Sequence, residues 1–176
     1  MARVKLRARA TGWRDAGTVV AEQREGASVR MSDGKIRVVI VDDHPVVRKG
    51  LSSFLSNESD IEVVGTAADG EESLKIVPDL KPDIVLMDLS MPGMGGIEAT
   101  RQLVQAMPEL RVMMLTSFGG HERMVQALKS GAIGYVVKDM APAELLSAVR
   151  SAARGDMSAT MSSGYGADEK KGTPSI

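Results

Sequence analysis

The chain of 176 residues contains no cysteine, only five aromatic residues and no long apolar run. Without cysteine it can form no disulfide and no thiolate metal site, and a reducing compartment is its expected environment. No apolar stretch approaches the roughly 18 residues of a membrane span, and no signal-peptide core lies near the start. These absences predict a soluble, cytoplasmic protein with no membrane contact, and the length fits one ordinary domain with tails.

Charge is unevenly distributed along the chain, although the net charge is only −1. Residues 1–32 hold seven Lys and Arg residues against three acids, whereas the remainder holds fifteen against twenty. A mildly acidic main domain is a poor candidate for binding nucleic acid by itself. Residues 1–35 show no helical or strand period, so we expect a disordered basic extension, with a nucleic-acid arm or targeting peptide as the alternative. Met31 precedes the first predicted strand, which makes a mis-assigned start another interpretation.

One short stretch organises the rest of the chain. Four apolar residues, 84–87, lead directly into the carboxylate of Asp88 and then into turn residues. A short apolar run between loop signals is typical of a strand that is buried on both faces of a parallel sheet. Asp88 therefore lies at the carboxyl edge of the predicted sheet, where open α/β folds place their chemistry.

The remaining pattern predicts alternating strands and helices. Apolar and β-branched runs predict strands at residues 36–41, 62–67, 84–88, 111–116 and 134–138. Helical spacing predicts helices over residues 45–57, 70–80, 97–106, 122–129 and 142–155. We expect the second helix to kink or stop early at Pro78. This alternation predicts an α/β, doubly wound (βα)5 domain with a five-stranded parallel sheet. The flavodoxin-like order 2-1-3-4-5, which we adopt, is one of the two common ways to wind such a sheet.

Four of the predicted strands end in functional groups: Asp42 and Asp43, Asp88, Thr116, and Lys138. In a parallel sheet these ends share one edge, and strands one and three would be neighbours about 5 Å apart. Crowded carboxylates need a counter-charge. Mg²⁺ suits oxygen ligands, and Lys138 supplies a second positive charge. A carboxylate in this setting is suited to attack phosphorus and form an acyl phosphate.

Four motifs then carry a family resemblance: Val-Asp-Asp-His-Pro (41–45), Met-Asp-Leu-Ser-Met-Pro-Gly-Met-Gly-Gly (87–96), Leu-Thr-Ser (115–117) and Gly-Tyr-Val-Val-Lys-Asp (134–139). Together they resemble the receiver domain of two-component response regulators, and the resemblance covers residues 36–155, about two-thirds of the chain. With Ala-Ala-Arg-Gly at 152–155, they are most similar to the NarL/FixJ/LuxR-type subfamily.

The resemblance implies a phosphorylation switch that is not a turnover enzyme. A sensor histidine kinase would phosphorylate an aspartate in a Mg²⁺-dependent reaction, and a surface of helix four, strand five and helix five would change in response. This surface and the face of helices one and five are the candidate homodimer interfaces. The residues implied are Asp88 as phosphoacceptor; Asp43, Asp88, the backbone carbonyl of Ser90 and, partly through water, Asp42 as Mg²⁺ ligands; Thr116 and Tyr135 as switch pair; and Lys138 as phosphate-binding lysine.

The chain departs from this subfamily at its C-terminal end. A LuxR-type helix-turn-helix output domain, through which full-length relatives control transcription, needs several dozen residues beyond the fifth helix, and only about twenty are present. We interpret residues 156–176 as a flexible tail or truncated linker. The chain is thus either a truncated product or a stand-alone receiver, and DNA binding is predicted only if an output domain exists in a longer protein.

Other interpretations remain open from the residues alone. A single Asp before a helix is more often an N-cap than a ligand, and Tyr135 could be an ordinary core residue. We interpret His44 as a loop residue beside Pro45, because one histidine makes no imidazole metal site. An aspartyl-phosphate hydrolase shares the Asp nucleophile but places a second Asp where Ser90 stands. A receiver-like scaffold that acts without phosphorylation is the third option. A nucleotide-binding domain, by contrast, is excluded, because the first predicted strand is followed by Asp-Asp-His-Pro and not by a glycine-rich phosphate-binding motif.

Overall fold

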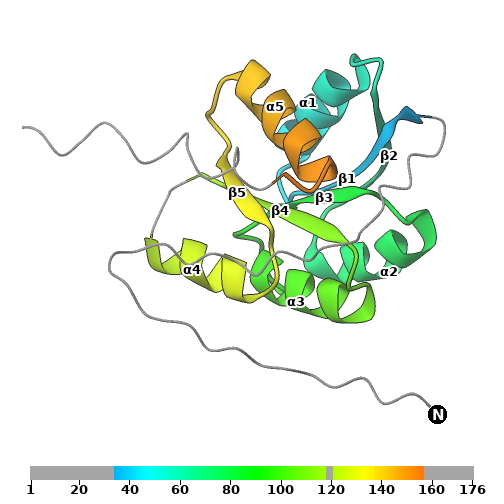
Figure 1. The fold of residues 1–176 in the computed structure, drawn as a ribbon. Coiled ribbons are helices and arrows are strands. Elements are labelled where there is room, and N and C mark those ends of the chain that lie inside the picture. Colours follow the sequence, from blue (N-terminus) through cyan, green and yellow to red (C-terminus); the bar gives the residue numbers. More distant parts are fainter. Residues whose placement is uncertain (1–33, 118–120, 157–176) are drawn as a thin grey trace, which may run out of the picture.

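The computed structural model describes residues 34–117 and 121–156. These residues form one sheet between two layers of helices, as Figure 1 shows. The strands are β1 (Ile36–Val41), β2 (Ile61–Ala67), β3 (Ile84–Asp88), β4 (Arg111–Thr116) and β5 (Gly134–Val137). The helices are α1 (Pro45–Ser56), α2 (Gly70–Leu80), α3 (Gly96–Ala106), α4 (His121–Lys129) and α5 (Pro142–Ala153). The strands lie in the order β2-β1-β3-β4-β5 and all pairs are parallel, which confirms the predicted flavodoxin-like fold.

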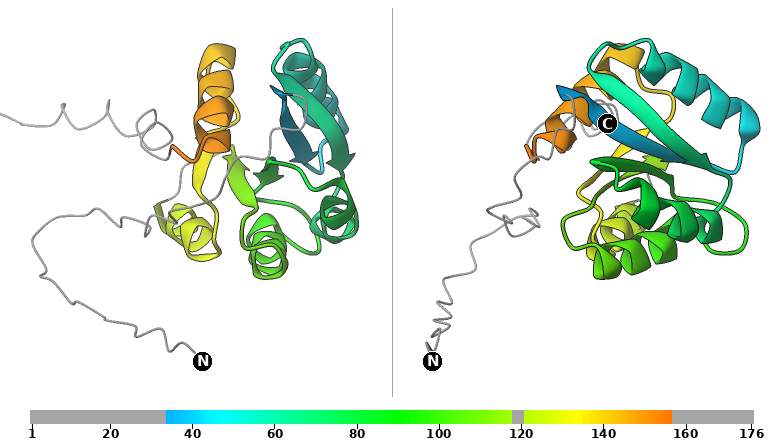
Figure 2. Two further views of the ribbon diagram at one scale, coloured as in Figure 1. Left: turned by 45° about the vertical axis from the view of Figure 1, so that its right-hand side comes forward. Right: turned by 90° about the vertical axis from the view of Figure 1, so that its right-hand side faces the viewer.

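Alternating side chains divide the core between the two faces of the sheet. Helices α1 and α5 cover one face, and α2, α3 and α4 cover the other, as the two views of Figure 2 make clear. In β1, Val38 and Ile40 pack with the α1–α5 side, whereas Val39 and Val41 pack with the other cluster. Successive residues of a strand point to opposite faces of the sheet. The alternation therefore determines to which face the residue at the end of each strand points.

The central strand β3 is buried along its whole length. It lies between β1 and β4, with Val41 beside Met87 and Leu115 beside Asp88. A strand with two neighbours and helices on both faces has no solvated side, which explains its unbroken apolar run. Asp88, the last residue of this strand, therefore lies at the carboxyl edge of the sheet and is itself buried.

Helix α2 corrects one prediction from the sequence. It continues through Pro78 to Leu80, so the expected early stop is wrong. Pro78 lies in the last turn, where its missing N–H forgoes a single hydrogen bond. The helix ends instead at Lys81, which has a left-handed φ of 47° and whose N–H donates to the Val77 carbonyl. The other predicted boundaries differ from the structure by at most two residues.

The predicted extension and tail lie outside the described residues, apart from residues 34, 35 and 156. Within the described ranges, no helix combines the length and the apolar character that crossing a bilayer requires.

Arg150 of α5 joins two parts of the chain that are far apart in sequence. Its guanidinium donates to both carboxylate oxygens of Asp60, at 2.7 Å each, and to Glu58 at 2.8 Å. Both acids belong to the connection between α1 and β2. The hydrogen bonds from Arg150 hold the pKa of Asp60 below its usual value of 3.8. This contact ties the last helix to the edge of the sheet.

We expect Arg150→Ala to lower the free energy of unfolding by about 1 kcal/mol at pH 7, a value limited by the partial solvent exposure of the three side chains. Because the folded-state pKa of Asp60 is lowered, this contribution is present above about pH 4 and is lost as pH falls through the folded-state pKa. Urea unfolding at several pH values measures both effects. Arg154→Ala, which removes a neighbouring charge with only a 3.4 Å contact to Ser151, is the control. A pH-independent difference would contradict the assignment.

Gly96 allows α3 to begin directly against the end of β3. A Cβ at this position would lie 2.0 Å from the carbonyl oxygen of Asp88, a distance that real Cβ atoms do not reach. At the preceding Gly95, the nearest atoms to a Cβ would be 3.9 Å away or more. The close approach at Gly96 therefore positions the start of α3 beside the predicted phosphoacceptor.

We expect Gly96→Ala to lower the free energy of unfolding by about 2–4 kcal/mol, because the clash involves backbone that cannot move away cheaply. Gly95 has a φ of −70°, which alanine adopts readily. Gly95→Ala should therefore cost less than about 1 kcal/mol. Urea unfolding followed by circular dichroism compares the two variants. Equal losses in both would show that the close approach at Gly96 is not a packing constraint.

Candidate functional site

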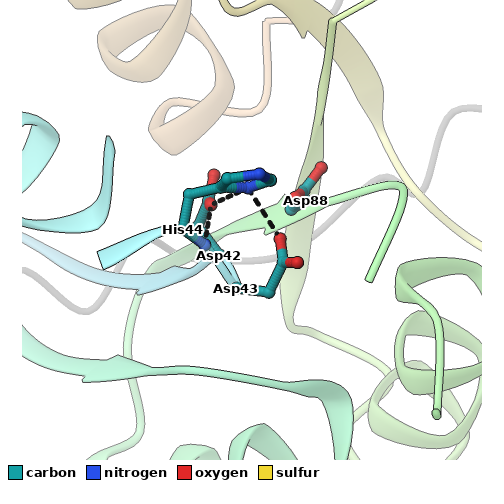
Figure 3. A group of neighbouring side chains, drawn as sticks. All are labelled: Asp42, Asp43, His44 and Asp88. Carbon is teal, nitrogen blue, oxygen red and sulfur yellow. Dashed lines mark hydrogen bonds and ion pairs between the residues drawn. The ribbon is translucent and has the colours of Figure 1, made fainter. Parts of the chain in front are cut away.

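The ends of β1, β3, β4 and β5 bring the predicted site residues to one edge of the sheet. Asp42 follows β1, Asp88 ends β3, Thr116 ends β4 and Lys138 follows β5. Asp42 and Asp88 are almost completely buried, with exposed fractions of 0% and 2%. The acids form a close group in Figure 3. Buried carboxylates need compensation from charges or hydrogen bonds, so their neighbours define what this site can do.

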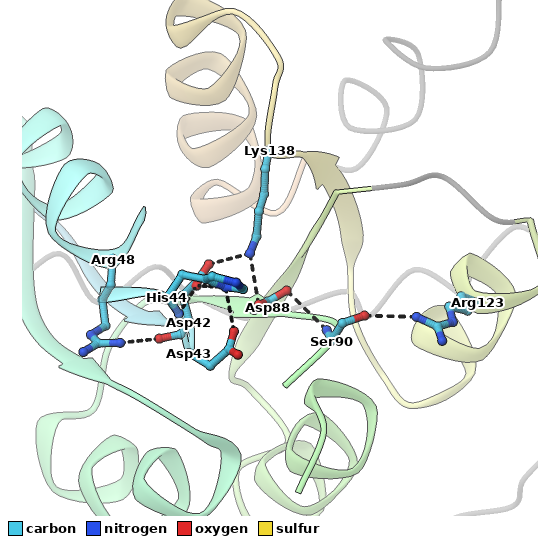
Figure 4. A network of polar contacts seen from close by, with 8 residues as sticks. All are labelled: Asp42, Asp43, His44, Arg48, Asp88, Ser90, Arg123 and Lys138. Carbon is cyan, nitrogen blue, oxygen red and sulfur yellow. Dashed lines mark hydrogen bonds and ion pairs between the residues drawn. The ribbon is translucent and has the colours of Figure 1, made fainter. Parts of the chain in front are cut away.

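Lys138 supplies that compensation from the end of β5. Its Nζ lies 2.7 Å from Asp42 Oδ2 and 3.0 Å from Asp88 Oδ2 (Figure 4). Its backbone N–H donates to the Thr116 carbonyl at 2.8 Å, which holds the residue beside β4. The sequence placed Lys138 next to Asp88. The still closer contact with Asp42 could not be predicted from the sequence, because it depends on the path of a long side chain.

The protonation of the group reflects burial and charge together. Burial raises the pKa of Asp88, and hydrogen bonds from Lys138 and from the Ser90 N–H offset part of that rise. Burial opposes the charge of Lys138, but the Asp42 and Asp88 carboxylates outweigh it and raise the pKa of Lys138 above its usual range. Lys138 is therefore a cation at neutral pH.

Oxygen atoms at this edge fit a hard divalent cation. Asp42, Asp43, His44 and Asp88 each offer one ligand atom, and these atoms lie within 4.8 Å of one another. Asp42 Oδ2 and Asp43 Oδ1 are buried and accept no well-directed hydrogen bond, although a nitrogen lies at ion-pair distance from each. Mg²⁺ favours such a set of carboxylate oxygens. The three predicted aspartates do converge, and the part of the Ser90 carbonyl stays a prediction.

His44 lies closer to the acids than the sequence suggested. It is the N-cap residue of α1, beside Pro45 as expected. Its Nδ1 is 2.9 Å from Asp43 Oδ1 and 3.4 Å from Asp42 Oδ1. The backbone N–H of His44 donates to Asp42 Oδ1. The imidazole thus lies against both carboxylates while its side chain stays 64% exposed. Its position directly after two acids was the only signal in the sequence.

Thr116 and Tyr135, the predicted switch pair, lie on adjacent strands. Thr116 is buried at the end of β4, with 4% of its surface exposed. Tyr135 lies in β5 beside Met114 of β4 and packs, half-buried, against the core cluster under α2, α3 and α4. The structure thus places both residues near the edge that holds Asp88, and the switching role stays a prediction.

Two arginines near the site were missed by sequence reasoning. Arg48 of α1 donates to the backbone carbonyl of Asp42, and Arg123 of α4 donates to Ser90 Oγ at 3.0 Å (Figure 4). The backbone N–H of Ser90 in turn donates to Asp88 Oδ1 at 3.2 Å. A contact over 33 residues depends on how α4 packs, and no local pattern in the sequence signals it.

Comparison with known proteins supports one family. The family model described as the response regulator receiver domain matches residues 38–150. The transcriptional regulatory protein LiaR of Bacillus subtilis is 42% identical over 121 residues, which are 69% of this chain and 57% of LiaR. The response regulator protein VraR of Staphylococcus aureus is 46% identical over 121 residues, 69% of this chain and 58% of VraR. The chain spans about half the length of the curated relatives it matches.

Solved structures give the same result. The signal receiver domain of the response regulator NarL from Mycobacterium tuberculosis has a TM-score of 0.66 at 36% identity, covering 69% of this chain and 98% of that one. A LuxR-family two-component response regulator from Aurantimonas sp. SI85-9A1 has a TM-score of 0.66 at 40% identity, covering 69% and 86%.

We expect Lys138→Met to destabilise the protein more in chelator than in Mg²⁺. Without the ammonium, two buried carboxylates lose their counter-charge, which should cost about 2–3 kcal/mol. A divalent cation held by the same acids would restore part of that loss. Urea unfolding of wild type and variant in EDTA and in Mg²⁺ measures the difference, with the exposed Lys129→Met of α4 as control. The same loss in both solutions would argue against a cation at this edge.

Proposed function

The chain belongs to the receiver domain family of response regulators, and on that premise we propose that it is a phosphorylation switch whose phosphoacceptor is Asp88. Receiver domains are components of two-component systems. One observation supports the assignment most directly. Asp88 is a buried carboxylate at the end of the central strand, with an ammonium 3.0 Å from one of its oxygens and two further aspartates beside it.

The chemistry assigned to Asp88 is nucleophilic attack on phosphorus. A carboxylate oxygen forms the new bond to phosphorus, and the bond between phosphorus and the donor's leaving atom breaks, which gives an acyl phosphate. Lys138 binds an oxygen of the transferring group and offsets the charge that collects there. Asp42 keeps Lys138 charged and in position. The donor is a sensor histidine kinase, and the reaction is a single transfer with no continuing turnover.

The residues that would hold Mg²⁺ are Asp42, Asp43, Asp88 and the backbone carbonyl of Ser90. When bound, the ion offsets the negative charge of the carboxylates and of the phosphoryl oxygens. Asp42 Oδ2 and Asp43 Oδ1 are buried and accept no well-directed hydrogen bond, and this feature of the chain supports a Mg²⁺ site. His44 Nδ1 lies 2.9 Å from Asp43 Oδ1 and would compete with an ion for that oxygen.

A phosphoryl group on Asp88 adds charge and acceptor oxygens at the edge where Thr116 lies. We assign Thr116 as donor to this group and Tyr135 as the residue that turns inward in response. The surface of α4, β5 and α5 is then the output of a two-state switch. In a longer protein like the transcriptional regulators it matches, this surface would control a DNA-binding output in the cytoplasm. Homodimer formation through this surface, or through α1 and α5, fits the same scheme.

We expect Asp88→Ala to abolish phosphorylation. Wild-type protein incubated with acetyl phosphate and Mg²⁺ should gain one phosphoryl group in its intact mass, and the group should not appear in EDTA. Asp79→Ala, which removes an exposed aspartate of α2, should be labelled like the wild type. A label that persists in Asp88→Ala would show that another residue is the acceptor. An unlabelled wild type would favour a scaffold that works without phosphorylation.

A further inference from the structure

We propose that Arg123 of α4 is a second phosphoryl-binding side chain of this site, beside Lys138. The inference rests on the proposed function, because it assumes a phosphoryl group on Asp88. It goes further by assigning a role to a residue of α4 that lies outside the four motifs.

Arg123 lies close to the phosphoacceptor, to which Ser90 connects it. Arg123 Nη1 donates to Ser90 Oγ at 3.0 Å, and the Ser90 N–H donates to Asp88 Oδ1 at 3.2 Å. A single residue therefore separates the guanidinium from the phosphoacceptor. Figure 4 shows Ser90 and Arg123 extending from Asp88 in a different direction from Lys138. A group attached to Asp88 would have one cation on each of two sides.

Arg123 differs in its partners from three other cations of the domain. Lys138 lies between two carboxylates, Arg150 lies against Asp60 and Glu58, and Arg101 pairs with Glu98 within α3. Among residues 34–117 and 121–156, no carboxylate lies at ion-pair distance from Arg123, whose hydrogen bond there goes to a neutral hydroxyl. Within this part of the chain, its positive charge is therefore not paired with a carboxylate.

A pocket lies beside Ser90, between the candidate site and α4. It has a volume of about 660 Å³ and is lined by Asp43 and Ser90 on the side of the site and by Arg123 and Gln126 of α4 on the other. Glu98 also lines it, but its carboxylate accepts from Arg101 and Gln102. Among the described residues, Arg123 is thus the one cationic side chain in the lining of the pocket that adjoins Ser90.

The consequence is an exchange of partners. A phosphoryl group brings a charge of about −1.5 to −2 and three strong acceptors. A guanidinium binds such oxygens with two parallel donors, more strongly than it binds a hydroxyl. Arg123 would therefore leave Ser90 Oγ for the phosphoryl oxygens. Because Arg123 belongs to the first turn of α4, this exchange links the state of Asp88 to the position of that helix.

The test compares wild type, Arg123→Gln, Arg123→Lys and Lys129→Gln. Lys129→Gln removes the same charge from the last turn of the same helix and serves as the control. Beryllofluoride, a mimic of the phosphoryl group, is titrated in the presence of Mg²⁺ and its bound signal followed by fluorine NMR. We expect Arg123→Gln to weaken its affinity roughly five- to tenfold, the effect of one charge-assisted hydrogen bond at a partly exposed site.

Further measurements separate the explanations. Arg123→Lys should weaken binding less than Arg123→Gln, and Lys129→Gln should match the wild type. Mg²⁺ affinity without the mimic, measured by calorimetry, should not fall in Arg123→Gln. Equal affinity of wild type and Arg123→Gln overturns the inference, and so does an equal loss in Lys129→Gln, while both leave the proposed function intact. A wild type that binds no beryllofluoride and gains no phosphoryl group overturns the proposed function, and the inference falls with it.

Discussion

The ammonium of Lys138, held between the carboxylates of Asp42 and Asp88, is the interaction on which the site depends. Each of these charges would be costly alone at this depth, and together they compensate one another. Their meeting requires β1, β3 and β5 to end at the same level. The parallel register brings these strand ends to the same level. Val41 lies beside Met87, and the backbone N–H of Lys138 donates to the Thr116 carbonyl at the end of β4. A slip of one residue in any strand would turn its terminal group to the opposite face.

The backbone around Asp88 is shaped to keep that end of β3 open. The Leu89 N–H donates to the Leu115 carbonyl, which continues the β3–β4 pairing one residue past Asp88. The chain then turns back so sharply that α3 begins against the carbonyl of Asp88, where only glycine fits at position 96. The result is a carboxylate whose backbone is fixed on both sides while its oxygens lie near the two acids that follow β1.

Much of this could be predicted from the sequence because apolar periodicity is a local property. It predicted the ten elements and the convergence of Asp42, Asp43, Asp88, Thr116 and Lys138, since parallel strands place their ends at one edge. It did not predict the strand order, which is one of two common ways to wind such a sheet and is the order that the structure has. The early stop at Pro78 was wrong, because proline in a last turn removes only one hydrogen bond. The contacts of Arg123 with Ser90 and of Arg150 with Asp60 join residues 33 and 90 positions apart, so no local pattern could reveal them.

The balance of charge at this edge supports the proposed switch. At rest the edge holds three aspartates against the single ammonium of Lys138, which is already shared between two of them. The surplus negative charge favours a cation, and a phosphoryl group on Asp88 would increase it further. If Asp88 is phosphorylated as we propose, the added charge would need compensation beyond Lys138, which is already paired with Asp42. We assign that part to Thr116 at the end of β4 and to Arg123 of α4, which donates to Ser90 Oγ. On this proposal, the charge at one buried carboxylate is linked to the positions of β4 and α4.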